Sequence, residues 1–226
     1  MAFRPSLKLL SLSALVALAC LGLHVQAFAA DQDLSVNARL LLAARNADSA
    51  ALARELAQGA AVNARNRLGE TALLIALKKN ELGMAKTMLD AGTDVNLAAV
   101  NGVTPLMAAA FAGEAQMVTA LLTRGADINA VDRLKKNAMT YAAGEGRTEV
   151  VKILLAKGAD PNAIYHNDLT ALMWAAGFGK TATVQVLLDA GARPELKDNR
   201  GLTALDMARE GKFEETAKVL ADARVM

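Results

Sequence analysis

The chain has few of the residues on which disulfide-bonded scaffolds, aromatic-rich β-folds and most active sites depend. Its 226 residues include one cysteine, two histidines, one tryptophan and two tyrosines, and aromatic residues make up only 4%. A single cysteine cannot form a disulfide within the chain, and a β-sandwich or barrel would need more aromatic and β-branched residues. Because 54% of the residues are nevertheless hydrophobic, alanine, leucine and valine must form most of the core, which suits closely stacked small helices.

The beginning of the chain has the composition of an export signal. It reads MAFRPSLKLLSLSALVALACLGLHVQAFAA, with a basic start, an apolar stretch over residues 9–23 and the tripeptide Ala-Phe-Ala at 27–29, which a signal peptidase accepts. The apolar stretch is shorter than the roughly 20 residues that span a bilayer. We therefore expect residues 1–29 to be a cleaved signal peptide and the mature protein to be periplasmic.

A lipid anchor at Cys20 is the alternative export route. This cysteine follows Ala17-Leu18-Ala19, but leucine is missing from the place where lipoprotein motifs usually have it. Residues 21–30 are also apolar, whereas a lipoprotein tether is usually polar. The sequence therefore favours a free periplasmic protein over a lipid-anchored one.

Cleavage near Ala29 would make the mature chain electrically balanced. It removes Arg4 and Lys8 but no acidic residue, which leaves 23 Lys and Arg against 23 Asp and Glu. A nucleic-acid partner would usually require a basic stripe to replace the counterions on phosphates, so we expect none. Cleavage also removes the only cysteine, which excludes thiol chemistry in the mature protein.

Similar segments recur every 33 residues along the rest of the chain. TALLIALKKN, TPLMAAAFAG, NAMTYAAGEG, TALMWAAGFG and TALDMAREGK begin at residues 71, 104, 137, 170 and 203, and glycines at 59, 92, 125, 158 and 191 follow the same period. The threonine or asparagine that starts each segment can cap a helix, and a glycine can end one. The pattern predicts helix pairs, each too small to bury its own apolar face, that stack on their neighbours.

These segments resemble the ankyrin repeat, which has the same TPLM-type helix start and GADVN-type turn. The resemblance covers residues 34–226 and implies an all-α repeat solenoid, in which each unit of about 33 residues is a helix-turn-helix with a β-turn finger. We expect an ankyrin-repeat domain over residues 30–226 with six units, the outer two being caps. The expected units are about 34–66, 67–99, 100–132, 133–165, 166–198 and 199–226.

One position departs from the family pattern. The fourth residue of the helix-start tetrapeptide is usually histidine, which makes a structural hydrogen bond. Here this place holds Leu74, Met107, Thr140, Met173 and Asp206, and we expect the apolar replacements to compensate by packing.

The mature chain offers little material for catalysis or for binding a metal. Its only histidine, His166, is far in the repeat order from its only serines, Ser35 and Ser49, so no nucleophile and base can meet. His166 and Asp168 supply two ligands where a zinc site needs three or four. Met84 and Met88 have helical spacing that a copper(I) site could use, but their positions favour core packing. We expect no enzyme, no cofactor and no metal site.

The resemblance implies a partner on the concave surface formed by the fingers and the first helices. Phe111 and Phe178 are informative because they stand close to an interhelix glycine, where the pattern is free to be polar, and exposed aromatic residues often anchor interfaces. For Trp174 and Tyr141, partial burial in the packing is the competing interpretation. The full predicted surface comprises Arg67, Glu70, Lys78, Lys79, Val100, Val103, Phe111, Arg133, Lys136, Tyr165, His166, Leu169, Trp174 and Phe178.

These observations favour a non-catalytic protein–protein interaction module that acts as a monomer in the bacterial periplasm. The basic side chains at one end suggest a partner with an acidic edge and an apolar middle. Bacterial proteins similar to this one include accessory factors for oxidative-stress enzymes such as catalases, and immunity or inhibitor proteins against secreted toxins. The sequence leaves both roles open. A metal or small-molecule carrier is the less favoured alternative.

Overall fold

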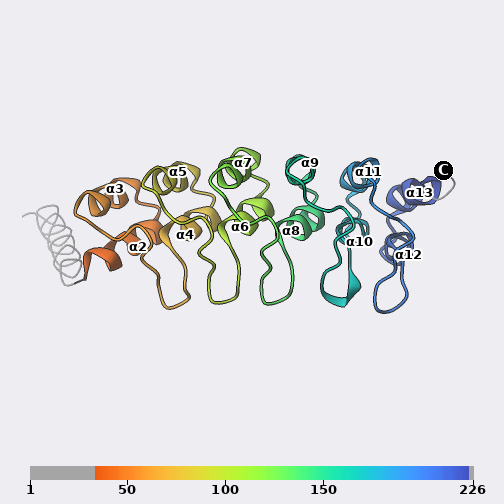
Figure 1. Cartoon of the computed structure of the whole chain (residues 1–226), viewed down its shortest axis with the longest axis horizontal. Coiled ribbons are helices and arrows are strands. Elements are labelled where there is room, and N and C mark those ends of the chain that lie inside the picture. Colours follow the sequence, from red (N-terminus) through yellow and green to blue (C-terminus); the bar gives the residue numbers. More distant parts are fainter. Residues whose placement is uncertain (1–33, 224–226) are drawn as a thin grey trace, which may run out of the picture.

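The computed structural model describes residues 34–223, which form a row of helix pairs without β-strands (Figure 1). The first helices of the pairs, called inner helices here, are α2 (Val36–Asn46), α4 (Ala72–Lys78), α6 (Pro105–Ala112), α8 (Ala138–Glu145), α10 (Ala171–Gly177) and α12 (Ala204–Glu210). The second or outer helices are α3 (Ser49–Ala57), α5 (Leu82–Asp90), α7 (Ala115–Thr123), α9 (Thr148–Ala156), α11 (Thr181–Asp189) and α13 (Glu214–Asp222).

Long loops, called fingers here, connect each outer helix to the next inner helix and project from the row on the side away from the outer helices (Figure 1). One finger contains a short 3-10 helix, η1 (His166–Asp168). The helices and fingers therefore form the all-α repeat solenoid that the sequence predicted.

The inner helices begin where the sequence predicted. At each start, the side chain of the capping residue accepts a hydrogen bond from the backbone N–H three residues further on. This bond satisfies one of the free N–H groups at a helix N-terminus. The capping residues are Thr71, Thr104, Asn137, Thr170 and Thr203. Asn137 therefore caps its helix in the same way as the threonines of the other four repeats.

The turn inside each pair has a residue with positive φ. Asn80 and Gly113 have φ values of 61° and 88°, as their residue types suggested. In the terminal pairs, Ala47 and Lys212 occupy the same register with φ values of 58° and 59°. A non-glycine residue in this region costs about 1 kcal/mol, so the terminal pairs keep the turn geometry at some cost to their stability.

The two methionines at the fourth place of the helix starts do more than pack, which corrects our expectation for the apolar replacements. The Sδ atoms of Met107 and Met173 accept the backbone N–H of the capping threonines at 3.5 and 3.4 Å. Thr140 Oγ1 accepts the Asn137 N–H at 3.0 Å, and Asp206 Oδ2 accepts the Thr203 N–H at 2.9 Å. Four of the five replacements thus supply an acceptor for the cap backbone, and only Leu74 compensates by packing alone.

The core is one continuous layer between neighbouring pairs. A column of alanines on the inner helices is fully buried and allows these helices to approach closely: Ala76, Ala109, Ala142, Ala175 and Ala208. Larger residues such as Leu106 and Leu172 fill the space beside it, each 1% exposed. Met84 and Met88 are equally buried, in agreement with the core-packing interpretation.

The predicted signal peptide at 1–29 and Cys20 lie outside the described residues. Within residues 34–223, no helix has the length and apolar character needed to cross a membrane.

We expect Thr140→Val to lower the free energy of unfolding by about 1–3 kcal/mol, because it leaves the buried Asn137 N–H without an acceptor. Thr119→Val is the matched control, since this exposed hydroxyl bonds only within its own helix; its effect should stay within about 0.5 kcal/mol. Urea denaturation followed by circular dichroism measures both. Equal effects would show that the Thr140 hydroxyl does not support the cap.

Candidate functional site

The predicted residues lie on one surface, formed by the fingers and by the inner-helix side chains beside them, which we call the finger–helix surface. The fingers contribute Arg67, Glu70, Val100, Val103, Arg133, Lys136, Tyr165, His166 and Leu169. The inner helices contribute Trp174 from the middle of α10, and Lys78, Lys79, Phe111 and Phe178 from the C-terminal ends of α4, α6 and α10.

Two aromatic pairs occupy the middle of this surface. The rings of Phe111 and Tyr141 meet edge to face with centroids 6.1 Å apart, and those of Trp174 and Phe178 stack at 5.9 Å. Phe111 and Phe178 remain 49% and 54% exposed, whereas Trp174 and Tyr141 are half-buried. The Trp174 and Phe178 rings lie beside Gly144, where an added Cβ would be 3.7 and 3.8 Å from them. An alanine at 144 would thus make ordinary van der Waals contact with both rings.

Lys136 connects the two aromatic pairs. It comes from the finger before α8, and its Nζ lies 4.4 Å from the Trp174 ring centroid and 5.8 Å from that of Tyr141. A cation in this position is attracted to the faces of the rings. No acidic side chain among residues 34–223 forms an ion pair with Lys136. The surface therefore presents a positive charge between aromatic rings.

A buried carboxylate holds Lys136 and Tyr141 in place. Asp132 Oδ1 accepts the backbone N–H groups of Leu134 and Lys136 at 2.8 and 2.9 Å, and Oδ2 accepts the Tyr141 hydroxyl at 2.6 Å. Burial, and then the hydrogen bond to Asp132 and its charge, raise the pKa of Tyr141. Asp132 thus couples the conformation of the finger to the orientation of an aromatic ring on α8.

An apolar pocket of about 320 Å³ lies beside Phe111, between α4 and α6. Ala108, which lines it, has a small side chain at a register where other repeats have larger ones: Ile75, Tyr141, Trp174 and Met207. The residues that line it are Leu77, Lys78, Asn80, Asn101, Val103, Met107, Ala108, Phe111, Ala112 and Tyr141.

The basic end of the surface is partly neutralised, which the sequence alone did not predict. Lys78 Nζ donates to Glu70 Oε1 at 2.7 Å. Burial acts to raise the pKa of Glu70, but the hydrogen bonds from Lys78 and Asn66 and the Lys78 charge lower it overall. Arg67 and Lys79 form no ion pair within the described residues, so they carry the free positive charge at this end.

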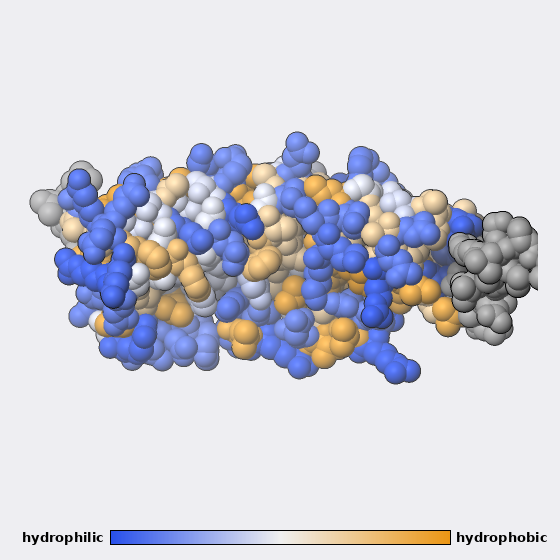
Figure 2. Space-filling view, turned by 180° about the vertical axis from the view of Figure 1, so that it is seen from behind, coloured by the Kyte–Doolittle hydropathy of each residue, from blue (hydrophilic) through white to orange (hydrophobic). Residues whose placement is uncertain are grey.

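Exposed aliphatic side chains on the fingers were not predicted. They are Leu68, Val131, Leu134 and Ile164, each between 43% and 63% exposed. Figure 2 shows hydrophobic patches among hydrophilic ones along the lower edge, where the fingers lie. The sequence could have indicated them, because they are apolar residues at finger positions where a turn does not require an apolar side chain.

His166 and Asp168 are both exposed on η1. No group of three or more His, Cys, Asp or Glu side chains in the described part of the chain is placed to hold a metal ion.

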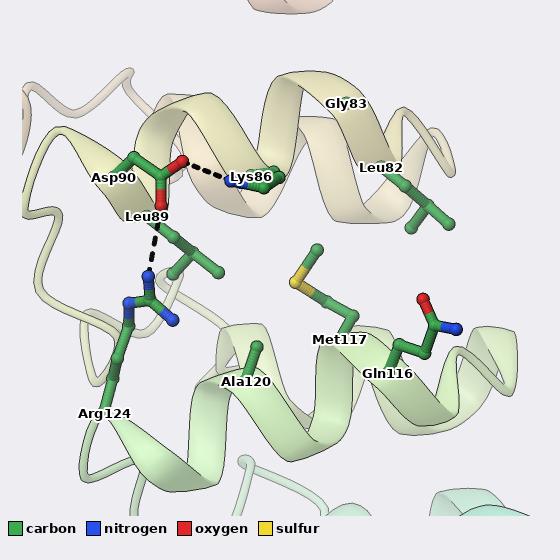
Figure 3. Close-up of a pocket in the computed structure, with 9 residues that line it drawn as sticks. All are labelled: Leu82, Gly83, Lys86, Leu89, Asp90, Gln116, Met117, Ala120 and Arg124. Atoms are coloured by element: carbon green, nitrogen blue, oxygen red, sulfur yellow. Dashed lines mark hydrogen bonds and ion pairs between the residues drawn. The ribbon is translucent and has the colours of Figure 1, made fainter.

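A second pocket, of about 410 Å³, lies on the outer helices, away from the fingers. Leu82, Leu89 and Met117 from α5 and α7 point into it (Figure 3). At one end, Asp90 accepts from Lys86 at 2.6 Å and from Arg124 at 3.2 Å. None of the predicted site residues lines this pocket.

The fold and the surface together define a helical repeat protein with a finger–helix surface. A family model described as ankyrin repeats (3 copies) matches residues 40–132, 92–165 and 139–225. These matches together cover more than half of the chain, which therefore belongs to the ankyrin-repeat family. No curated protein matches the chain significantly.

The two tyrosines provide a test of the finger contacts. Burial is the main cause that raises the pKa of both Tyr141 and Tyr165. Because the folded-state pKa exceeds the unfolded value of about 10, the stabilisation from the neutral phenols is complete below pH 10 and is lost as the pH rises through the folded-state values.

We expect far less tyrosinate absorbance at pH 10 in the native protein than in the urea-unfolded protein. Ultraviolet titration with and without urea measures the difference. Titration of either tyrosine at its ordinary pKa in the folded protein would contradict the burial of its hydroxyl and, for Tyr141, the hydrogen bond to Asp132.

Proposed function

We propose that the protein is a non-catalytic interaction module that binds a protein partner on its finger–helix surface. Ankyrin repeats are generally protein–protein interaction modules. The observation that carries the proposal is the aromatic row on α6, α8 and α10, in which Phe111 and Phe178 leave about half of each side chain exposed. Exposed aromatic residues beside well-packed neighbours are favoured as interface anchors.

The distribution of reactive side chains supports a binding role over catalysis. Ser35 and Ser49 lie at the first helix pair, while His166 lies on η1 in the fifth repeat along the chain. A solenoid brings only neighbouring repeats into contact, so these groups have no common site.

The composition of residues 1–29 supports a periplasmic location for this module. In that compartment, support of an oxidative-stress enzyme such as a catalase and neutralisation of a secreted toxin are the roles that the proposal includes. Both are protein-binding roles that would use the same surface. The identity of the captured partner decides between them.

We expect the double variant Phe111→Ala/Phe178→Ala to lose the partner that the wild type captures from periplasmic extract or culture supernatant. Truncating one anchor residue typically weakens an interface by about 2 kcal/mol or more, which is roughly 30-fold in the dissociation constant. Affinity capture followed by mass spectrometry compares the two proteins.

Gln116→Ala/Gln185→Ala is the matched control, because both glutamines are exposed on outer helices. This variant should capture the partner as the wild type does. Equal capture by the phenylalanine variant, with its fold intact by circular dichroism, would place the binding site elsewhere.

A further inference from the structure

The pocket beside Phe111 and the ammonium group of Lys136 are adjacent, because both contact the same side chain. Tyr141 lines the pocket, and its ring centroid lies 5.8 Å from Lys136 Nζ. A partner segment that fills the pocket therefore passes close to the lysine. The pocket is complementary to an apolar side chain, and the ammonium group is complementary to an acidic one, on the same partner segment.

The pocket has the properties of a receptor for one large apolar side chain. Leu77, Met107 and Ala108 are buried residues that line it, and Phe111 and Tyr141 line it together with them. Polar lining comes from Asn80, Asn101 and the paired Lys78. Burying an aliphatic or aromatic side chain in such a place gains about 1.5–3 kcal/mol before the costs of ordering.

The charge around the pocket favours an acidic neighbour for that apolar side chain. Lys79 and Lys136 form no ion pair within residues 34–223, whereas Glu70, the acid beside the pocket, is already paired with Lys78. Glu145, at the end of α8, is an exposed acid on the same helix as Tyr141. A carboxylate on Lys136 would also be shielded from water by the flanking rings, which strengthens a charge-assisted hydrogen bond.

We propose that the partner presents a short acidic and apolar segment, in which a large apolar side chain fills the Ala108 pocket and a nearby carboxylate binds Lys136 Nζ. This inference rests on the proposed function and names the chemistry of the partner. The carboxylate replaces no interaction that the fold needs, because Asp132 holds the Lys136 backbone through its N–H and leaves the ammonium free.

The test uses random linear peptides displayed on phage and selected on the immobilised protein. On the wild type, we expect enrichment of peptides that combine Asp or Glu with a large apolar residue close by. Lys136→Met keeps the apolar stem over the rings but removes the charge, and should weaken the selected peptides about tenfold or more. Lys136→Glu should shift the selection from acidic to basic peptides.

The pocket is tested with Ala108→Ile, which places at 108 the residue that another repeat already has at Ile75. This variant should fold like the wild type and lose the preference for a large apolar residue while keeping that for an acid. Lys152→Met, on the outer face of α9, is the control for loss of a lysine and should leave the selection unchanged. Circular dichroism melting verifies the fold of each variant.

Peptides whose composition and affinity are the same on Lys136→Met and Ala108→Ile as on the wild type would overturn the inference. Enrichment of no peptide, or binding of anionic lipid vesicles in place of peptides, would overturn it as well. In each case, a partner that is captured by the wild type and lost by Phe111→Ala/Phe178→Ala would still support the proposed function. Capture that survives that double variant would overturn the proposed function separately.

Discussion

Each helix pair in this protein relies on the pair beside it, because two short helices cannot bury their apolar faces alone. The contact is possible because the inner helices have alanine at one register in five successive repeats, all fully buried. Leucine and methionine side chains then fill the remaining space from both neighbours. A substitution that enlarges the alanine column would separate two pairs and weaken both interfaces, whereas the fingers and exposed helix positions can vary at little cost to the stack.

This freedom explains how the finger–helix surface acquires its chemistry. At the register of Ala108, the other inner helices have Ile75, Tyr141, Trp174 and Met207. The small residue lines a pocket, and Phe111 from the same repeat and Tyr141 from the next supply the rings that line it as well. Buried Asp132 then ties the finger to Tyr141 and positions Lys136 between the rings. Binding features thus arise from differences between repeats on a framework that their similarities stabilise.

Pairing within the chain determines which charges a partner can meet. Lys78 is neutralised by Glu70, while the Lys136 ammonium forms no ion pair among the described residues and lies over the rings of Tyr141 and Trp174. Lys78 and Lys136 therefore differ in the positive charge that each can present to a partner. The apolar middle and acidic edge that the sequence suggested for the partner correspond in the structure to a pocket and a lysine that both lie beside Tyr141, which favours a compact partner segment.

The sequence by itself determined the repeat, its period, the helix starts and the alanine column, because each of these depends on residue types at fixed spacing. It also indicated Phe111 and Phe178, since apolar residues at free positions are visible in a repeat register. Only the tertiary structure decided that Met107, Thr140, Met173 and Asp206 support the caps, that Lys78 is paired, and that Lys136 lies between Tyr141 and Trp174. These outcomes depend on side-chain rotamers and on contacts between a finger and two helices, and residue spacing carries no information about either.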